Sequence, residues 1–246
     1  MLLWVTMPGI LPMRNVLAAA ALILAGLVPA FASAADAPAT PPAPDPAWKI
    51  PEVITFIGVK PGDKVADIIA GRLTGALAEA VGPNGKVYAV ETAEIAKSHP
   101  EGMALMKKLA QKQPNIVVSA DPVASPLPPG LDAVFIRQNY HDLYDKFMGP
   151  ADVKAFNKAV FTALKPGGVY VVLDHVAATG SGIAATDTLH RIDPARVKSD
   201  VLAAGFQLQA ESQILANPAD DHTKSVFDPS LRNHTDQFLY KFVKPK

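Results

Sequence analysis

The sequence predicts an α/β protein with a Rossmann-like, doubly wound sheet of about seven strands, mostly parallel with the last strand antiparallel. Short apolar runs alternate with amphipathic helical segments from residue 49 onward. Residues 61–91, PGDKVADIIAGRLTGALAEAVGPNGKVYAVE, read as strand, glycine turn, helix, glycine turn and strand. A long loop joins the last two strands, as in a hairpin, which favours a reversed final strand.

The strands are predicted from apolar, β-branched runs that are bounded by glycine, proline or polar residues. The first two flank the helix of the 61–91 unit, and the run DAVFI marks a strand in the middle of the chain. The predicted strands are residues 64–69, 86–90, 115–119, 131–136, 169–173, 206–212 and 237–243.

The helices are predicted from apolar residues spaced three or four apart and from terminal signals. Pro150 is placed in the first turn of one helix, Asp193 and Pro194 cap another, and Gly205 ends it. The predicted helices are residues 52–57, 73–81, 102–113, 150–164 and 194–203. In the third of these, the side chains expected to point inward are Met103, Leu105, Met106 and Leu109.

Residues 1–34 are predicted to be a signal peptide. Arg14 is followed by an uncharged apolar run, and Ala32, Ser33 and Ala34 form a small-x-small cleavage signal. A start at Met7 or Met13, or an uncleaved membrane anchor, is an alternative. We therefore expect a periplasmic or secreted protein with a Pro/Ala-rich linker at 35–48, a domain at 49–246 and no stable membrane span after cleavage.

The composition limits the classes of ligand. There are 23 basic and 23 acidic residues and no basic patch, which argues against nucleic acid as a partner. The absence of cysteine excludes disulfides and thiolate metal sites. A small molecule is the expected partner, and the sequence does not indicate an oligomeric state.

Ligands of open parallel sheets bind at the carboxyl ends of the strands, where the strand order reverses. Asp67, Ala70 and Gly71 follow the first predicted strand at this edge. Glu91 ends the second strand, where an acid can accept hydrogen bonds from ribose hydroxyls. Asp121 follows the third strand. This arrangement predicts a nucleotide site next to the helix N-terminus.

Two histidines and two carboxylates follow the fourth and fifth strands at the same edge. His141 and Asp142 come after the fourth, and Asp174 and His175 end the fifth. A histidine can act as a general base near neutral pH, and a carboxylate can fix its tautomer. His190 and His222 are expected to join them, with Arg191 available for an anionic group.

The 61–91 segment resembles the front half of a class I S-adenosylmethionine-dependent methyltransferase. Residues 163–174, ALKPGGVYVVLD, resemble the region where a helix of that family ends and its fifth strand begins. The region after the signal peptide also resembles a group of exported bacterial predicted methyltransferases. The segments that carry this second resemblance are residues 138–142, 146–150, 187–193 and 217–224.

The resemblance implies methyl transfer from S-adenosylmethionine to a small molecule, with proton removal from a hydroxyl acceptor by a histidine. The implied cofactor-binding residues are Asp67, Ala70, Gly71, Glu91, Asp121 and Asn139. The implied catalytic residues are His141, His175, Asp142 and Asp174. The implied substrate-binding residues are Tyr140, His190, Arg191 and His222. No metal site is included in this interpretation.

The glycine turn differs from the family pattern at two positions. Ile69 and Leu73 stand where the family usually has glycine, which lets the backbone approach the cofactor closely. One alternative is therefore a binding module that has kept the fold without the cofactor. Another is a metal-assisted hydrolase or lyase that uses His141, Asp174, His175 and His190.

Overall fold

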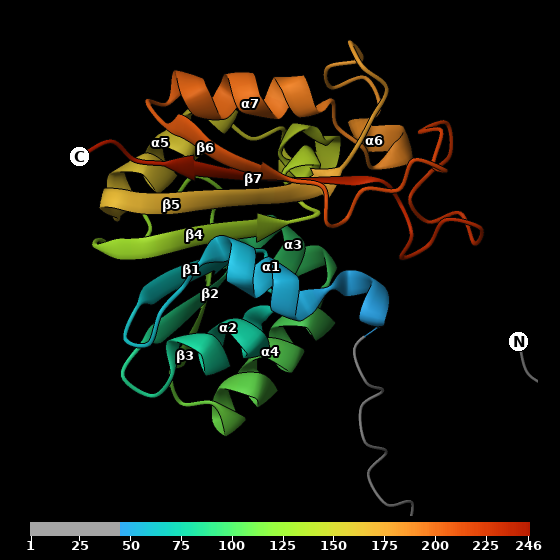
Figure 1. The fold of residues 1–246 in the computed structure, drawn as a ribbon. Coiled ribbons are helices and arrows are strands. Elements are labelled where there is room, and N and C mark those ends of the chain that lie inside the picture. Colours follow the sequence, from blue (N-terminus) through green and yellow to red (C-terminus); the bar gives the residue numbers. More distant parts are fainter. Residues whose placement is uncertain (1–44) are drawn as a thin grey trace, which may run out of the picture. The chain divides into compact units, whose positions relative to one another are not determined.

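A computed structural model describes residues 45–246, so the predicted signal peptide and most of the predicted linker lie outside the described residues. One seven-stranded sheet has the strand order β3-β2-β1-β4-β5-β7-β6 (Figure 1). The strands are β1 (Lys64–Ile68), β2 (Lys86–Thr92), β3 (Ile116–Asp121), β4 (Leu131–Arg137), β5 (Leu164–His175), β6 (Gln207–Ser212) and β7 (Gln237–Val243).

Only β7 runs against its neighbours. It pairs antiparallel with both β5 and β6, whereas the pairs among β1 to β5 are parallel. The predicted fold class, with a reversed final strand, is confirmed.

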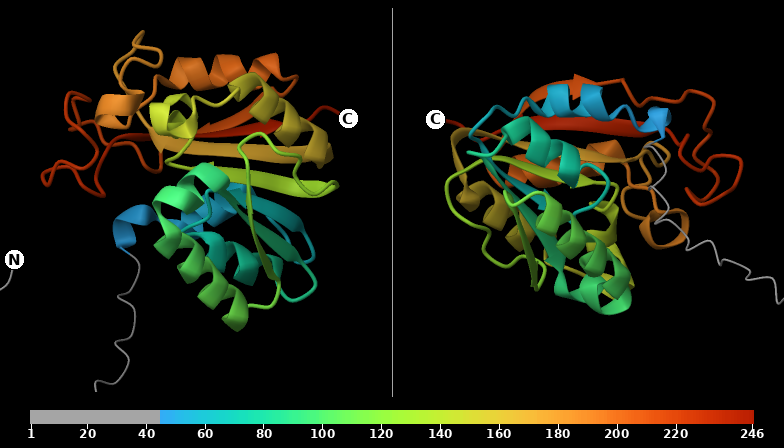
Figure 2. Two further views of the ribbon diagram at one scale, coloured as in Figure 1. Left: turned by 180° about the vertical axis from the view of Figure 1, so that it is seen from behind. Right: turned by 90° about the horizontal axis from the view of Figure 1, so that it is seen from below.

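Helices cover both faces of the sheet (Figures 1 and 2). They are α1 (Ile50–Ile57), α2 (Thr74–Val81), α3 (Ala93–Ser98), α4 (Pro100–Lys112), α5 (Val153–Ala163), α6 (Thr186–Leu189) and α7 (Pro194–Ala203). Short 3-10 helices occur at η1 (Pro46–Trp48), η2 (His141–Tyr144) and η3 (Lys146–Met148). Within residues 45–246, no helix combines the length and apolar character needed to cross a membrane.

The two faces of the sheet form separate apolar cores because successive strand residues point to opposite sides. Val65 of β1 packs with Leu77 of α2 in one core. Ile68 of the same strand belongs to the other core, together with Phe156 of α5 and Val197 of α7. Burial on both faces explains why the central strands have apolar runs rather than alternating patterns.

Two predicted details of the helices are wrong. Pro150 lies before α5, which begins at Val153. Asp152 caps this helix, because its carboxylate accepts a hydrogen bond from the Ala155 N–H at 2.8 Å. Leu105 is 61% exposed, whereas Met106 of the same helix is buried. The reason is that α4 presents only a narrow face to the sheet, so a neighbouring position points into solvent.

The strand order reverses between β1 and β4, at the centre of the sheet. Each of these strands is followed by a residue with left-handed backbone, Ile69 (φ 53°) and Gln138 (φ 55°). Their N–H groups still donate to the neighbouring strands, to Val90 and Leu173, at 2.7 Å. The chain therefore leaves the sheet abruptly at both positions. This conformation is unusual for a β-branched residue and marks a specialised site.

Candidate functional site

A cleft lies at the carboxyl ends of the central strands. A cavity of about 540 Å³ is lined by residues that follow β1, β4 and β5, and by loop residues His190 and Phe227. A smaller cavity of about 200 Å³ contains Asp67, Ala70 and Gly71 in its wall. The two cavities share Ile69, Arg72, Arg137 and Asn139. They therefore adjoin and form one site at the predicted position.

Asp67 organises the turn after β1. Its Oδ2 accepts a hydrogen bond from Thr74 Oγ1 at 2.6 Å, and the Gly71 N–H donates to the same hydroxyl at 3.0 Å. Burial raises the pKa of Asp67 to about 6, although the hydrogen bonds oppose this. A Cβ atom added to Gly71 would meet no atom within 4 Å. The backbone at Gly71 is therefore open to an incoming ligand.

The two bulky residues of the glycine turn have different surroundings. Leu73 is 2% exposed and packs in the core beneath α1 and α2, although it also borders the smaller cavity. Ile69 borders both cavities. Of these two residues, Ile69 is therefore the one that lies between the two cavities.

Glu91 and Asp121 share a third cavity of about 380 Å³, whose wall includes Ile68, Tyr88 and Phe156. Glu91 Oε1 accepts a hydrogen bond from the Thr92 N–H at 3.0 Å. Burial, reinforced by the negative charge of Asp67, raises the pKa of Glu91 to about 7. This cavity combines apolar walls with two carboxyl groups at the ends of β2 and β3.

His141 is held by the end of β5. Its Nδ1 lies 2.8 Å from Asp174 Oδ1, and its peptide N–H donates to Asp174 Oδ2 at 2.9 Å. Its Nε2 lies 3.1 Å from Asp142 Oδ1. Burial alone would lower the pKa of His141, but the adjacent carboxylates of Asp174 and Asp142 raise it to about 10.

The pKa of His175 is shifted in the opposite direction to that of His141. Its Nδ1 lies 2.7 Å from Thr235 Oγ1, and its ring centre is 6.2 Å from that of His141. Burial, assisted by the positive charges of His141 and Arg137, lowers its pKa well below the ordinary value. The pKa values of the two adjacent imidazoles are therefore shifted in opposite directions, so protonation favours His141 over His175.

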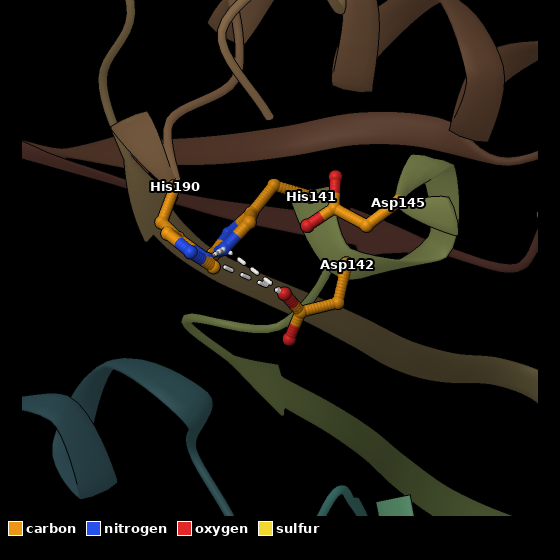
Figure 3. Close-up of side chains that lie close together, drawn as sticks. All are labelled: His141, Asp142, Asp145 and His190. Carbon is orange, nitrogen blue, oxygen red and sulfur yellow. Dashed lines mark hydrogen bonds and ion pairs between the residues drawn. The ribbon is translucent and has the colours of Figure 1, made fainter. Parts of the chain in front are cut away.

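Asn139, Asp142 and His190 complete this side of the cleft, and Asp145 is buried next to them. Asn139 Nδ2 donates to Asp142 Oδ2 at 2.7 Å, and His190 packs edge-on against Phe227 with ring centres 4.8 Å apart. Figure 3 shows His141, Asp142, Asp145 and His190 gathered from η2, the residue after it and the residue after α6. The two histidines and the two aspartates form one polar cluster.

Two of the predicted substrate-binding residues do not reach the cleft. Tyr140 is fully buried, and its hydroxyl accepts a hydrogen bond from Asn157 Nδ2 at 2.8 Å. Arg191 is also fully buried, and its Nη2 donates to both carboxylate oxygens of Asp220 at 3.1 and 2.8 Å. A substrate could contact neither side chain, so these two predictions are corrected.

His222 is a partly exposed member of the same hydrogen-bonded network as Arg191. Its Nε2 lies 2.9 Å from Asp236 Oδ2, and its peptide N–H donates to Asp220 Oδ1 at 3.0 Å. It does not line the cleft, so its position favours a role in tying the loop between β6 and β7. His190, by contrast, lines the larger cavity as predicted.

Sequence reasoning missed Arg72, Arg137, His99 and Asp145. Both arginines line both cavities, and the guanidinium of Arg137 forms no hydrogen bond or ion pair with any residue of 45–246. Burial, with the nearby charge of Arg72, lowers the pKa of Arg137 to about 10. The Arg72 guanidinium lies 4.0 Å from the centre of the Trp48 ring. The sequence feature that indicates Arg72 as a site residue is its position inside the glycine turn.

No protein-family model matches this chain, and no curated protein matches it in sequence. Solved structures do match its fold. A SAM-dependent methyltransferase from Aquifex aeolicus is 16% identical, with 81% of this chain and 93% of that chain covered and a TM-score of 0.54. The N-methyltransferase NodS from Bradyrhizobium japonicum is 13% identical, with 82% and 95% covered and a TM-score of 0.52.

The cyclase SpnF is 17% identical, with 81% of this chain and 80% of that chain covered and a TM-score of 0.58. The chain therefore has the fold of S-adenosylmethionine-dependent methyltransferases, a fold that also supports another reaction, as the name of SpnF states.

Proposed function

We propose that this protein is an exported methyltransferase that binds S-adenosylmethionine and methylates a small molecule in the periplasm. The central observation is that the turn at Asp67–Gly71, the acid Glu91 and the pair His141 and His175 meet at one edge of the sheet. The periplasmic location follows from the predicted signal peptide at residues 1–34. The resemblance to exported bacterial methyltransferases supports the same assignment.

The residues at this edge fit the cofactor. Glu91 would accept hydrogen bonds from the ribose hydroxyls, and the apolar cavity next to it, with Asp121 at its rim, would receive the adenine ring. The open backbone at Gly71 would adjoin the amino-acid part of the cofactor, together with Ala70 and Asn139. When bound, the cofactor supplies an electrophilic methyl group.

The acceptor needs a position in line with that methyl group and, if it is a hydroxyl, a base. His175 is the better candidate for the base, because it is neutral and its Nε2 makes no hydrogen bond within residues 45–246. His141 has both ring nitrogens close to carboxylates and is suited to positioning. Arg137 and Arg72 would attract an anionic group of the cofactor or the acceptor.

Calorimetric titration of the mature protein with S-adenosylmethionine and S-adenosylhomocysteine tests the proposal. We expect about one ligand per chain and a loss of affinity in Glu91→Gln, because the amide cannot accept both ribose hydrogen bonds as strongly. Glu52→Gln, an exposed position on α1, is the matched control and should bind as the wild type does. An absence of heat with both ligands at high protein concentration would rule out the methyltransferase assignment.

Ile69 favours a second candidate, a binding module without the cofactor, because its side chain borders both cavities. In that case the cleft would hold another small molecule between Arg137 and the histidines. The same titration separates the two candidates, since only the first predicts that the wild-type protein binds S-adenosylmethionine.

A further inference from the structure

Four side chains at the rim of the cleft offer ligand atoms to a single point. His141, Asp142, Asp145 and His190 each contribute one nitrogen or oxygen, and these atoms all lie within 4.8 Å of one another. Figure 3 shows that the four side chains converge although His190 is far from the others in sequence. The fold has therefore assembled a mixed imidazole and carboxylate cluster.

The spacing of three of these atoms suits a coordination sphere. His141 Nε2 lies 3.1 Å from Asp142 Oδ1 and 3.3 Å from His190 Nδ1, and the third side of the triangle is 3.9 Å. Ligands about 2.0–2.1 Å from a tetrahedral ion stand about 3.3 Å apart. Small rotations of His190 and Asp142 would close the triangle around an ion.

Asp174 orients His141 from the side of the ring that faces away from the cluster. It lies 2.8 Å from His141 Nδ1, so it can hold that nitrogen as a donor and leave Nε2 toward the cluster. A carboxylate behind the far nitrogen of a metal-binding histidine is the usual arrangement. Asp174 itself is fully buried, which makes this orientation rigid.

Asp145 gives an independent indication of a missing partner. Asp145 is 1% exposed, and neither of its carboxylate oxygens makes a hydrogen bond of good geometry within residues 45–246, although the Thr186 hydroxyl lies nearby. A buried carboxylate without a partner costs several kcal/mol unless a cation or donor compensates it. Its carboxylate points toward His141 in Figure 3. A cation in the cluster would satisfy it.

We propose that His141, Asp142, Asp145 and His190 bind one divalent transition-metal ion. Imidazole and carboxylate ligands without thiolate favour zinc, manganese or iron(II) over softer or harder ions. His141, Asp142 and His190 also line the larger cavity, so the ion would face the bound small molecule. Metal binding does not depend on the proposed methyltransferase activity; only a role for the ion in holding an acceptor oxygen rests on it.

The alternative to a metal-bound cluster is a cluster without metal, in which His141 Nε2 carries a proton in place of the ion. An imidazolium between Asp142 and Asp174 would also be well stabilised. That state leaves Asp145 without a partner and gives the cluster no affinity for metal. The two states therefore predict different results in a metal titration.

The test uses the mature protein without a histidine tag, purified without chelators and then stripped and titrated with Co²⁺ near neutral pH. We expect about one Co²⁺ per chain, visible d–d absorption and a raised thermal midpoint. Elemental analysis before stripping should find about one zinc, manganese or iron per chain.

Asp145→Asn and His190→Ala should each weaken Co²⁺ binding at least tenfold. His234→Ala, on an exposed surface, is the matched control and should leave binding unchanged. Circular dichroism checks that each variant is folded, and the His190 side chain, 30% exposed, can be shortened with little risk to the core. Stoichiometry well below one, or equal affinity in His190→Ala and His234→Ala, would overturn the proposal.

Discussion

A single carboxylate, that of Asp174, binds both the backbone and the ring of His141: Oδ2 accepts the peptide N–H at 2.9 Å, and Oδ1 lies 2.8 Å from Nδ1. Asp174 is the penultimate residue of β5, whereas His141 follows β4. The pair therefore locks together the two strand ends that form one wall of the cleft. It is fully desolvated, so each partner depends on the other.

Asp174→Ala should lower the free energy of unfolding by about 3 kcal/mol, because it leaves a buried imidazolium with one fewer compensating carboxylate. Urea denaturation followed by circular dichroism measures this change. Asp187→Ala removes a partner of the exposed Lys146 and should cost less than about 1 kcal/mol. Equal losses in the two variants would show that the Asp174–His141 pair adds nothing to stability.

Glu91 should make the protein less stable as the pH rises. Its pKa is raised from 4.5 to about 7, so the folded state holds a proton that the unfolded state has already released. The resulting stabilisation is complete below pH 4.5 and is lost as the pH rises through about 7. The thermal midpoint of the wild type relative to Glu91→Gln should therefore fall between these two pH values. A difference that does not change with pH, or one that grows, would contradict this.

Ile69→Gly should strengthen binding of S-adenosylmethionine several-fold. The change removes an apolar side chain that borders both cavities, and glycine adopts the left-handed backbone of this position (φ 53°) without the cost of about 1 kcal/mol or more for an L side chain. Calorimetry compares the variant with Ile183→Ala, whose side chain is exposed outside the cleft. Unchanged affinity in Ile69→Gly would show that Ile69 does not limit access.

Leu73→Gly is not equivalent to Ile69→Gly, although Leu73 and Ile69 both stand where the family pattern of the glycine turn has glycine. Leu73 is 2% exposed in the core, so its loss should cost about 2–5 kcal/mol of stability. Any change in binding would then be confounded by partial unfolding.

Arg191→Ala should destabilise the protein by about 3–5 kcal/mol, because it leaves Asp220 as a buried charge without its guanidinium partner. Arg196→Ala, which breaks a surface pair with Asp200, is the control and should cost under about 1 kcal/mol. Thermal melts measure both. If Arg191→Ala melts like the wild type and only ligand binding is lost, Arg191 contacts the ligand after all.

The strands and the position of the cleft could be predicted from sequence because they depend on local patterns. Short apolar, β-branched runs and glycine-containing turns specify most strands, and the strand order then fixes the edge at which polar residues meet. The reversed final strand followed from the long loop before it.

The directions of individual side chains could not be predicted in the same way. Tyr140 and His141 are adjacent, yet Tyr140 points to Asn157 of α5 and His141 points to Asp174 of β5. The segment forms a 3-10 helix, which follows neither the strand nor the α-helix pattern. Asp145 is not marked by any sequence pattern, because its burial depends on the packing of α6 and η2.

The position of β7 has a consequence for how the chain folds. Residues 237–243 come after β6 in sequence but occupy the slot between β5 and β6. Gln237 and Phe238 pair with His175 and Asp174, and Thr235 holds the His175 ring. The His175 side of the cleft is therefore complete only after the C-terminal segment has inserted between β5 and β6, so a chain that ends before Thr235 would lack these contacts.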